Sequence, residues 1–211
     1  NSFNIVGGFL NLTISDKYYL NFIESIKDDI DFGKSKKQNE TFIVEFSSPN
    51  TNKPLHLGHI RNNLLGYSIS KILEANGKNV KKVQIINDRG IHICKSMIAW
   101  KQYGEGKTPK SESIKGDKFV GDYYILFDKI HNEQKNELLN SGIEKDKAEE
   151  STQIMQDAKN ELMNWEKNDE ETLKIWNMMN QWVYEGFEST YKLLGVSFDK
   201  NYYESQTYLL G

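Results

Sequence analysis

The segment His56-Leu57-Gly58-His59 constrains this chain more than any other, because of the sequence on either side of it. Residues 41–46, TFIVEF, are dense in β-branched and aromatic side chains, as a buried parallel strand should be, and a Ser-Ser-Pro-Asn turn follows. Beyond His59, apolar residues recur with the period of a helix. Strand, turn and helix therefore present two imidazoles and free backbone N–H groups at a helix N-terminus, where phosphate binds favourably.

This arrangement predicts a nucleotide site, and Gly58 removes a side chain where the nucleotide would have to approach closely. It suits ATP whose α-phosphate is being attacked. Two other interpretations of the histidine pair are a metal site and a pair of surface caps. One cysteine, Cys94, and two further histidines supply no convincing set of zinc ligands. We therefore expect a nucleotide site and no metal site.

Composition places the chain among ordinary globular proteins. Its 211 residues are 37% hydrophobic, enough for a sizeable core in one domain or in one domain with an insertion. The single cysteine argues for a reducing compartment. No apolar run approaches membrane-spanning length and no secretion leader opens the sequence, so we expect a cytoplasmic protein with no membrane partner. The net charge of −3 gives no global sign of nucleic-acid binding, but a local basic groove is compatible with it.

Two candidate motifs converge on one edge of a predicted parallel sheet. The helix after the histidines closes at Gly77, and a second strand spans Val80 to Ile86 before the sequence Asn87-Asp88-Arg89-Gly90. Strand, helix and strand at these lengths predict a parallel βαβ unit, whose ligands bind beyond the carboxyl ends of the strands. Residues 47–59 and this tetrapeptide both lie there. Asn87 and Asp88 are therefore candidate ligand residues, with turn formation as an equally open alternative.

Most of the remaining sequence predicts helices. Residues 3–15 indicate a short strand pair, residues 18–30 a short helix and residues 91–103 another. After a break marked by glycine and proline, the apolar pattern predicts three helices, around 119–130, 154–165 and 173–194, the last ended by Gly195. Such stripes are far more often core seams of a helical bundle than ligand sites, so we assign them to packing.

Residues 45–61, EFSSPNTNKPLHLGHIR, closely resemble the signature segment of arginyl-tRNA synthetases, and His56-Leu57-Gly58-His59 resembles the HIGH motif of class I aminoacyl-tRNA synthetases. The resemblance extends through residues 87–90 and 182–187 to 203–211. It implies an α/β fold, the first half of a Rossmann-type parallel-sheet catalytic domain with a helical insertion.

The resemblance also implies a division of the chain. Residues 1–20 resemble the tail of the family's N-terminal additional domain, and residues 21–107 the first half of the nucleotide-binding catalytic domain. Residues 108–195 would form the helical connective insertion, and residues 196–211 the return to the catalytic domain.

The implied activity is that of an arginine–tRNA ligase. Such an enzyme forms arginyl-adenylate from L-arginine and ATP, with Mg²⁺ accompanying the ATP, and passes arginine to tRNA(Arg). By resemblance, His56 and His59 contact the phosphates and stabilise charge on the α-phosphate, and Lys53 assists them. Gly58 makes room for the adenine.

By the same resemblance, Glu45, Ser48 and Asn50 match the positions that contact arginine. Arginine needs a carboxylate for its guanidinium and acceptors for its α-ammonium, and bidentate carboxylate pairing is the strongest recognition available. Glu45 falls at the carboxyl end of its predicted strand, so it can face the crevice. The alternative for Glu45 is a solvent-facing edge residue.

The departures from the family pattern matter as well. Nothing in the sequence resembles the second class I signature, the KMSKS loop, and the family's downstream tyrosine and aspartate of the arginine pocket and its anticodon-binding domain are missing. We therefore expect an incomplete piece of the enzyme that is inactive alone. Two other hypotheses remain: a small nucleotidyltransferase of the His-x-Gly-His superfamily, and a non-catalytic synthetase-like module that binds RNA or protein.

Overall fold

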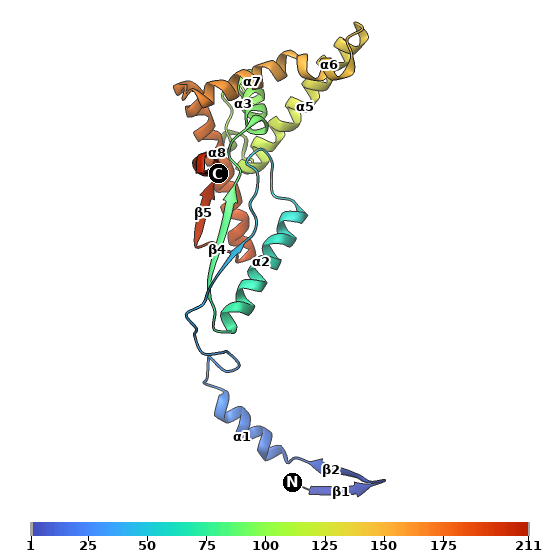
Figure 1. Cartoon of the computed structure of the whole chain (residues 1–211), viewed down its shortest axis with the longest axis vertical. Helices are drawn as coiled ribbons and strands as arrows, with labels where there is room; N and C mark the ends of the chain where they lie inside the picture. Colours follow the sequence, from blue (N-terminus) through green and yellow to red (C-terminus); the bar gives the residue numbers. More distant parts are fainter. Residues whose placement is uncertain (1, 211) are drawn as a thin grey trace.

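The computed structural model describes residues 2–210, and its N-terminal elements lie at one end of an elongated molecule, away from the sheet (Figure 1). Strands β1 (Ser2–Val6) and β2 (Phe9–Thr13) form an antiparallel hairpin. The two glycines between them, Gly7 and Gly8, have φ of 56° and 85°, a conformation that side chains with a Cβ rarely adopt. Helix α1 (Asp16–Ile26) follows. The predicted strand pair and short helix are confirmed.

The central element is a parallel sheet of β3 (Thr41–Glu45), β4 (Asn79–Ile86) and β5 (Lys200–Tyr203), in the order β3-β4-β5. Glu45 pairs with Val83, and Val83 pairs with Lys200. Helix α2 (Leu57–Ala75) connects β3 to β4 and ends before Gly77, whose φ is 79°. The predicted α/β class and βαβ unit are therefore confirmed, and the chain returns to this sheet as β5.

Helix α2 lies close to the sheet because its buried positions carry small or polar residues, Asn63, Gly66 and Ser70. A Cβ on Gly66 would come within 2.3 Å of the Phe46 ring, so only glycine permits this approach. The predicted apolar stripe of this helix is instead exposed within this chain, as the exposed fractions of Leu65 and Ile72, 55% and 62%, demonstrate.

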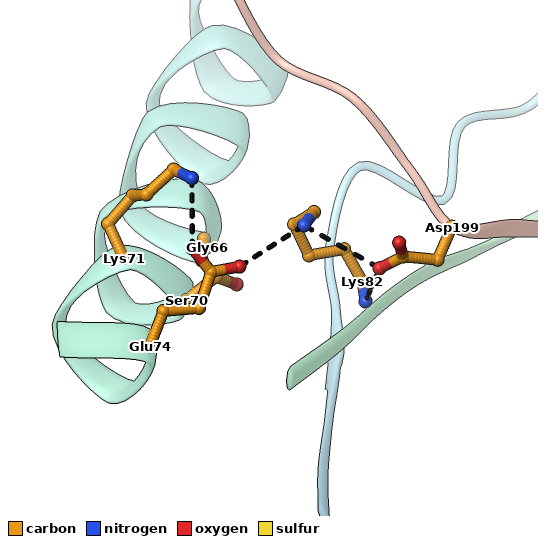
Figure 2. Close-up of polar contacts among 6 residues, drawn as sticks. All are labelled: Gly66, Ser70, Lys71, Glu74, Lys82 and Asp199. Carbon is orange, nitrogen blue, oxygen red and sulfur yellow. Dashed lines mark hydrogen bonds and ion pairs between the residues drawn. The ribbon is translucent and has the colours of Figure 1, made fainter. Parts of the chain in front are cut away.

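A half-buried lysine in the middle of β4 connects helix α2 with the residue that precedes β5 (Figure 2). The Lys82 ammonium lies 3.3 Å from the Glu74 carboxylate of α2 and 3.6 Å from the Asp199 carboxylate, just before β5. Asp199 also accepts a hydrogen bond from the Lys82 backbone N–H at 2.7 Å, which lowers the pKa of its carboxyl. Lys71 donates to Glu74 and lowers the pKa of that carboxyl. These contacts fix the start of β5 against β4 and α2.

The helices from residue 91 onward gather beyond the carboxyl edge of the sheet, and the last long one continues alongside the sheet (Figure 1). They are α3 (Ile91–Tyr103), α4 (Pro109–Glu112), α5 (Gly116–Asn140), α6 (Lys145–Ser151), α7 (Gln153–Glu166) and α8 (Glu170–Leu194), and α9 (Glu204–Thr207) and a 3₁₀ turn (Tyr208–Leu210) follow β5. The three predicted helices are confirmed as α5, α7 and α8, with Gly195 left-handed at the end of α8, whereas the short α4 and α6 were not predicted.

The helical core is built from α3, α5 and α8, and its buried residues are Ile93, Cys94, Met97, Phe119, Val120, Met179, Val183, Phe187 and Tyr191. The sequence assigns residues 91–103 to the nucleotide-binding half of the chain. By packing, however, α3 joins the helical body, because its buried face contacts α5 and α7. Among the helices described in residues 2–210, none has both the length and the apolarity that crossing a bilayer requires.

Candidate active site

The loop that connects β3 to α2, residues 46–56, is here called the signature loop, and it begins with a strained turn. Ser47 and Ser48 have φ of 70° and 44°, values that are costly for residues with a Cβ. The Ser47 N–H donates to Asn62 Oδ1 at 2.6 Å, and the Ser47 hydroxyl lies 2.7 Å from the Tyr191 hydroxyl. Contacts from α2 and α8 therefore hold this turn.

The turn brings two of the predicted arginine-contacting residues together. The Ser48 hydroxyl donates to Glu45 Oε1 at 2.8 Å and accepts from the Ile85 N–H of β4 at 3.0 Å. Glu45 is exposed at the carboxyl end of β3, which is an edge strand of this sheet. Ser48 thus sets the orientation of the Glu45 carboxylate.

The signature loop extends the sheet by one further parallel bridge, between Asn50 and Asn87. The Asn87 N–H donates to Pro49 O and the Thr51 N–H donates to Asn87 O, both at 3.0 Å. Asn87 Oδ1 is buried and has no hydrogen-bond partner among the described residues. Asn50 and Asn87 therefore lie side by side at the carboxyl edge, as predicted from their positions after adjacent strands, and Asn87 retains an open acceptor.

Asp88 was predicted to be either a ligand residue or a turn former, and its surroundings distinguish the two. It is 1% exposed, and its carboxylate accepts hydrogen bonds from the Ser205 N–H and hydroxyl, both at 2.8 Å, and from the Tyr184 hydroxyl at 3.0 Å. Burial and the charge of Asp88 raise the pKa of Tyr184, so this hydroxyl remains a donor. The protein itself satisfies the Asp88 carboxylate, which favours the structural alternative over contact with substrate.

Arg89 connects the same turn to the C-terminal segment. Its guanidinium lies 3.6 Å from the ring centre of Tyr208 and 5.2 Å from that of Trp165, a cation–π geometry. It also pairs with Glu166 of α7 at 3.2 Å. No local sequence pattern marks Arg89 for its pair with Glu166, which is 77 positions away.

The histidine pair forms a reciprocal cap at the start of α2. His56 Nδ1 accepts from the Gly58 N–H at 3.1 Å, and His59 Nδ1 accepts from the His56 N–H at 3.2 Å. Because both Nδ1 atoms accept, Nε2 carries the proton in each neutral ring and is a donor. Burial, followed by the charges of His56 and Lys53, lowers the pKa of His59, so its neutral form is favoured.

Gly58 has a local reason to be glycine, in addition to the room it was expected to leave for adenine. A Cβ at this position would come within 2.9 Å of the His56 ring. The ring centres of His56 and His59 are 4.0 Å apart, so a side chain here would displace one of the two imidazoles. Glycine between the histidines therefore lets the His56 ring keep its capping position.

Lys53 is exposed on a part of the signature loop that rests on the helical body. Gly121 of α5 is buried beneath it, and a Cβ on Gly121 would lie 2.6 Å from Pro54 Cδ and 3.5 Å from Lys53 Cα. This close contact between loop and helix fixes the position of the Lys53 backbone. The predicted residues thus lie at the carboxyl ends of β3 and β4, on the signature loop and in the first turn of α2.

The contacts that hold this loop come mostly from residues that the sequence did not mark as functional. Tyr191 was assigned to packing, and Asn62 and Gly121 were not singled out. Their partners are 144, 15 and 67 positions away along the chain, and no local pattern marks such pairs. Within residues 2–210, no group of three His, Cys, Asp or Glu side chains is placed to bind a metal ion.

Comparison with known proteins adds independent information. The family model described as tRNA synthetases class I (R), catalytic domain, matches residues 23–208. The arginine–tRNA ligase of Flavobacterium psychrophilum is 52% identical over 212 residues, and that of Porphyromonas gingivalis is 53% identical over 209 residues. These matches cover 100% and 98% of this chain but 35% of each relative, so the chain spans about a third of their length.

Solved structures agree in fold. The arginyl-tRNA synthetase of Thermus thermophilus matches with a TM-score of 0.59 at 24% identity, covering 97% of this chain and 29% of that protein. The synthetase of Plasmodium falciparum matches with a TM-score of 0.55 at 20% identity, covering 97% of this chain and 33% of that protein. On the match to the family model and the identity to the bacterial ligases, this chain belongs to the class I tRNA synthetases (R), within their catalytic domain.

Proposed function

We propose that the natural polypeptide containing this chain is an arginine–tRNA ligase, and that this chain supplies the first half of its catalytic site. The observation that carries the proposal is that the signature loop joins the Glu45–Ser48 pair at the carboxyl end of β3 to the capped histidine pair at the start of α2. One loop thereby connects the candidate amino-acid site to the candidate phosphate site. Family membership supports the same activity.

Phosphate binding follows from the start of α2. Apart from the Gly58 N–H, which donates to His56, the first N–H groups of the helix and the two Nε2–H donors of His56 and His59 provide hydrogen bonds without a fixed positive charge on His59. Lys53 adds an ammonium on the same loop. Mg²⁺ would enter with ATP, held by the phosphates, and would neutralise their charge.

In the proposed first step, an oxygen of the arginine carboxylate attacks the α-phosphorus of ATP. The bond to the bridging oxygen breaks, and diphosphate leaves. Donors placed at the α-phosphate stabilise the extra charge of the pentacoordinate state, so catalysis depends on positioning and electrostatics. In the second step, a hydroxyl at the 3′ end of tRNA(Arg) attacks the carbonyl carbon of the adenylate, and AMP leaves.

For arginine, we propose Glu45 as the carboxylate that pairs with a cationic group, with Ser48 and Asn50 as its polar neighbours. The Ser48 hydroxyl orients one oxygen of Glu45 and leaves the other open to a donor. Asn87 is the further candidate, because its buried amide oxygen has no partner among the described residues.

In the proposed domain organisation, residues 21–107 and 196–211 belong to the nucleotide-binding half of the catalytic domain. Residues 108–195 are the helical insertion, and residues 1–20 belong to an additional N-terminal domain. We propose that tRNA(Arg) is the macromolecular partner, that no membrane is involved, and that the protein acts in the cytoplasm.

The test compares the natural full-length polypeptide with the 211-residue chain. We expect arginine-dependent exchange of diphosphate into ATP and charging of tRNA by the full-length protein, and neither by the 211-residue chain, because no KMSKS-like segment occurs in it. Adenylylation of a different acceptor would favour the small nucleotidyltransferase. Binding of RNA or protein with no adenylate formation would favour the non-catalytic module.

A further inference from the structure

Tyr191 lies near the end of α8, yet its hydroxyl contacts the first turn of the signature loop. The side chain is 3% exposed, and the hydroxyl lies 2.7 Å from Ser47 Oγ and 2.9 Å from Gln84 Oε1. Burial raises the pKa of Tyr191 to about 12, so the hydroxyl is protonated. Its one proton goes to Gln84 Oε1, which can only accept, and the Ser47 hydroxyl is therefore the donor to Tyr191.

The amide nitrogen of Gln84 supports this assignment of donor and acceptor. Gln84 Nε2 donates to Asn201 Oδ1 of β5 at 3.0 Å, which orients the amide oxygen toward α8. A buried chain of hydrogen bonds consequently runs from Ser47 through Tyr191 and Gln84 to Asn201. It joins the signature loop, the insertion helix and two strands.

The turn at Ser47 and Ser48 needs such support. Both residues have positive φ without being glycine, a conformation that persists only when surrounding contacts impose it. Ser47 has two such contacts, the Asn62 amide oxygen on its N–H and Tyr191 on its hydroxyl. Ser48 follows directly, and its hydroxyl sets the Glu45 carboxylate.

We propose that Tyr191 is a positioning residue of the arginine site: through Ser47 it holds the left-handed turn that presents Ser48 and Glu45. This inference rests on the proposed function, because it assumes that Glu45 and Ser48 contact arginine. Tyr191 is buried and its hydroxyl is engaged by Ser47 and Gln84, so its loss changes the geometry of the turn and leaves the capped histidines in place.

The test is Tyr191→Phe in the natural full-length polypeptide. Phenylalanine keeps the packing against Phe187 and Phe198 and removes only the hydroxyl, which leaves Ser47 Oγ and Gln84 Oε1 without this partner. We expect the arginine KM in diphosphate exchange to rise about five- to tenfold, the size of one lost buried hydrogen bond, while the ATP KM and kcat stay within about twofold.

A matched control and a rescue separate positioning from general loss of stability. Val183→Ala removes a fully buried side chain from the same helix, and we expect it to lower the unfolding temperature without changing the arginine KM more than about twofold. Ser47→Gly adopts positive φ freely, so in that background Tyr191→Phe should not raise the arginine KM further. An equal rise in both KM values, or a rise no larger than that of Val183→Ala, would overturn the proposal.

Hydrogen exchange provides a readout that does not depend on activity. In Tyr191→Phe we expect faster amide exchange across residues 46–51 and unchanged exchange in the hairpin of β1 and β2. Unchanged exchange across residues 46–51 would overturn the anchoring role of Tyr191. If the wild-type protein forms no arginyl-adenylate but exchange in the variant is faster, the proposed function fails and Tyr191 remains the anchor of the turn.

Discussion

The Tyr184 hydroxyl donates to the Asp88 carboxylate across 96 positions of sequence, at 3.0 Å. Two other residues on the same stripe of α8, Trp176 and Asn180, donate to the Asp88 backbone carbonyl at 2.6 and 3.4 Å. Their spacing of four places all three on one helix face. A single residue at the end of β4 therefore accepts hydrogen bonds from three turns of α8, and this fixes the helix along the sheet.

We expect Asp88→Asn to lower the free energy of unfolding by about 2 kcal/mol, because the amide keeps the shape but presents a donor where Ser205 and Tyr184 also donate. Urea unfolding followed by tryptophan fluorescence measures this. Asp146→Asn, at an exposed position of α6, is the matched control and should change stability little. Wild-type stability in Asp88→Asn would show that these hydrogen bonds contribute nothing net.

His59→Ala in the natural full-length polypeptide should lower the rate of adenylate formation a hundredfold or more, about 3 kcal/mol, as removal of one donor to a developing charge does. His59 caps the start of α2 and is not part of the helical core, so folding should survive. Diphosphate exchange measures the rate and circular dichroism checks the fold. Near-normal turnover would remove His59 from the catalytic group.

Glu45→Gln preserves the shape of the side chain at the end of β3 and its contact with the Ser48 hydroxyl, but removes the charge. If arginine pairs with this carboxylate, its KM should rise about tenfold or more while the ATP KM changes little, because charge-assisted pairs are stronger than neutral ones. Steady-state kinetics on both substrates make the comparison. A loss of stability with both KM values unchanged would instead identify Glu45 as structural.

The buried carboxyl group of Glu161 should make the stability of the protein depend on pH. It is 3% exposed in α7, Oε1 has no partner among the described residues, and its nearest cation, Lys101, is 3.8 Å away. Burial raises the pKa of Glu161, so the folded state binds its proton more tightly than the unfolded state does. The resulting stability is present below the unfolded pKa and is lost as the pH rises through the folded pKa.

Glu161→Gln should therefore stabilise the protein at neutral pH. It should also reduce the loss of stability that occurs as the pH rises above about 4.5, the ordinary pKa of a glutamate. Thermal unfolding from pH 4 to pH 8 measures both effects. Glu137→Gln on α5, which is exposed, should not change the profile. A destabilised Glu161→Gln at pH 7 would show that the pair with Lys101 outweighs the cost of burial.

The fold was predictable where local sequence carries the signal. The density of β-branched residues marked β3 and β4, and the glycines at 77 and 195 marked the ends of α2 and α8. The apolar stripe of α2 was recognised but is exposed in this chain, because Gly66 and Ser70 form its buried face. Periodicity gives the helix without determining which face contacts the sheet, since a glycine that permits close approach carries no hydrophobic signal.

The candidate site shows the same limit. The histidine cap lies within four consecutive residues and was one open interpretation of them, whereas Asp88 could not be separated from a ligand without Tyr184 and Ser205, 96 and 117 positions away. Asn and Asp after a strand are compatible with a turn and with a ligand role, and only burial with full hydrogen bonding distinguishes the two. Tyr191 carried no signal beyond its place in an apolar stripe.

The contact between Gly121 and Pro54 has a consequence for engineering this family. Deletion of the helices between residues 108 and 195 in favour of a short linker would leave Lys53 and Pro54 without the surface on which they rest, and would leave the Ser47 hydroxyl without its acceptor. A minimal nucleotide-binding core cut from this sheet would thus have to rebuild that support. Transplanted insertions would need a residue without a side chain at the position of Gly121.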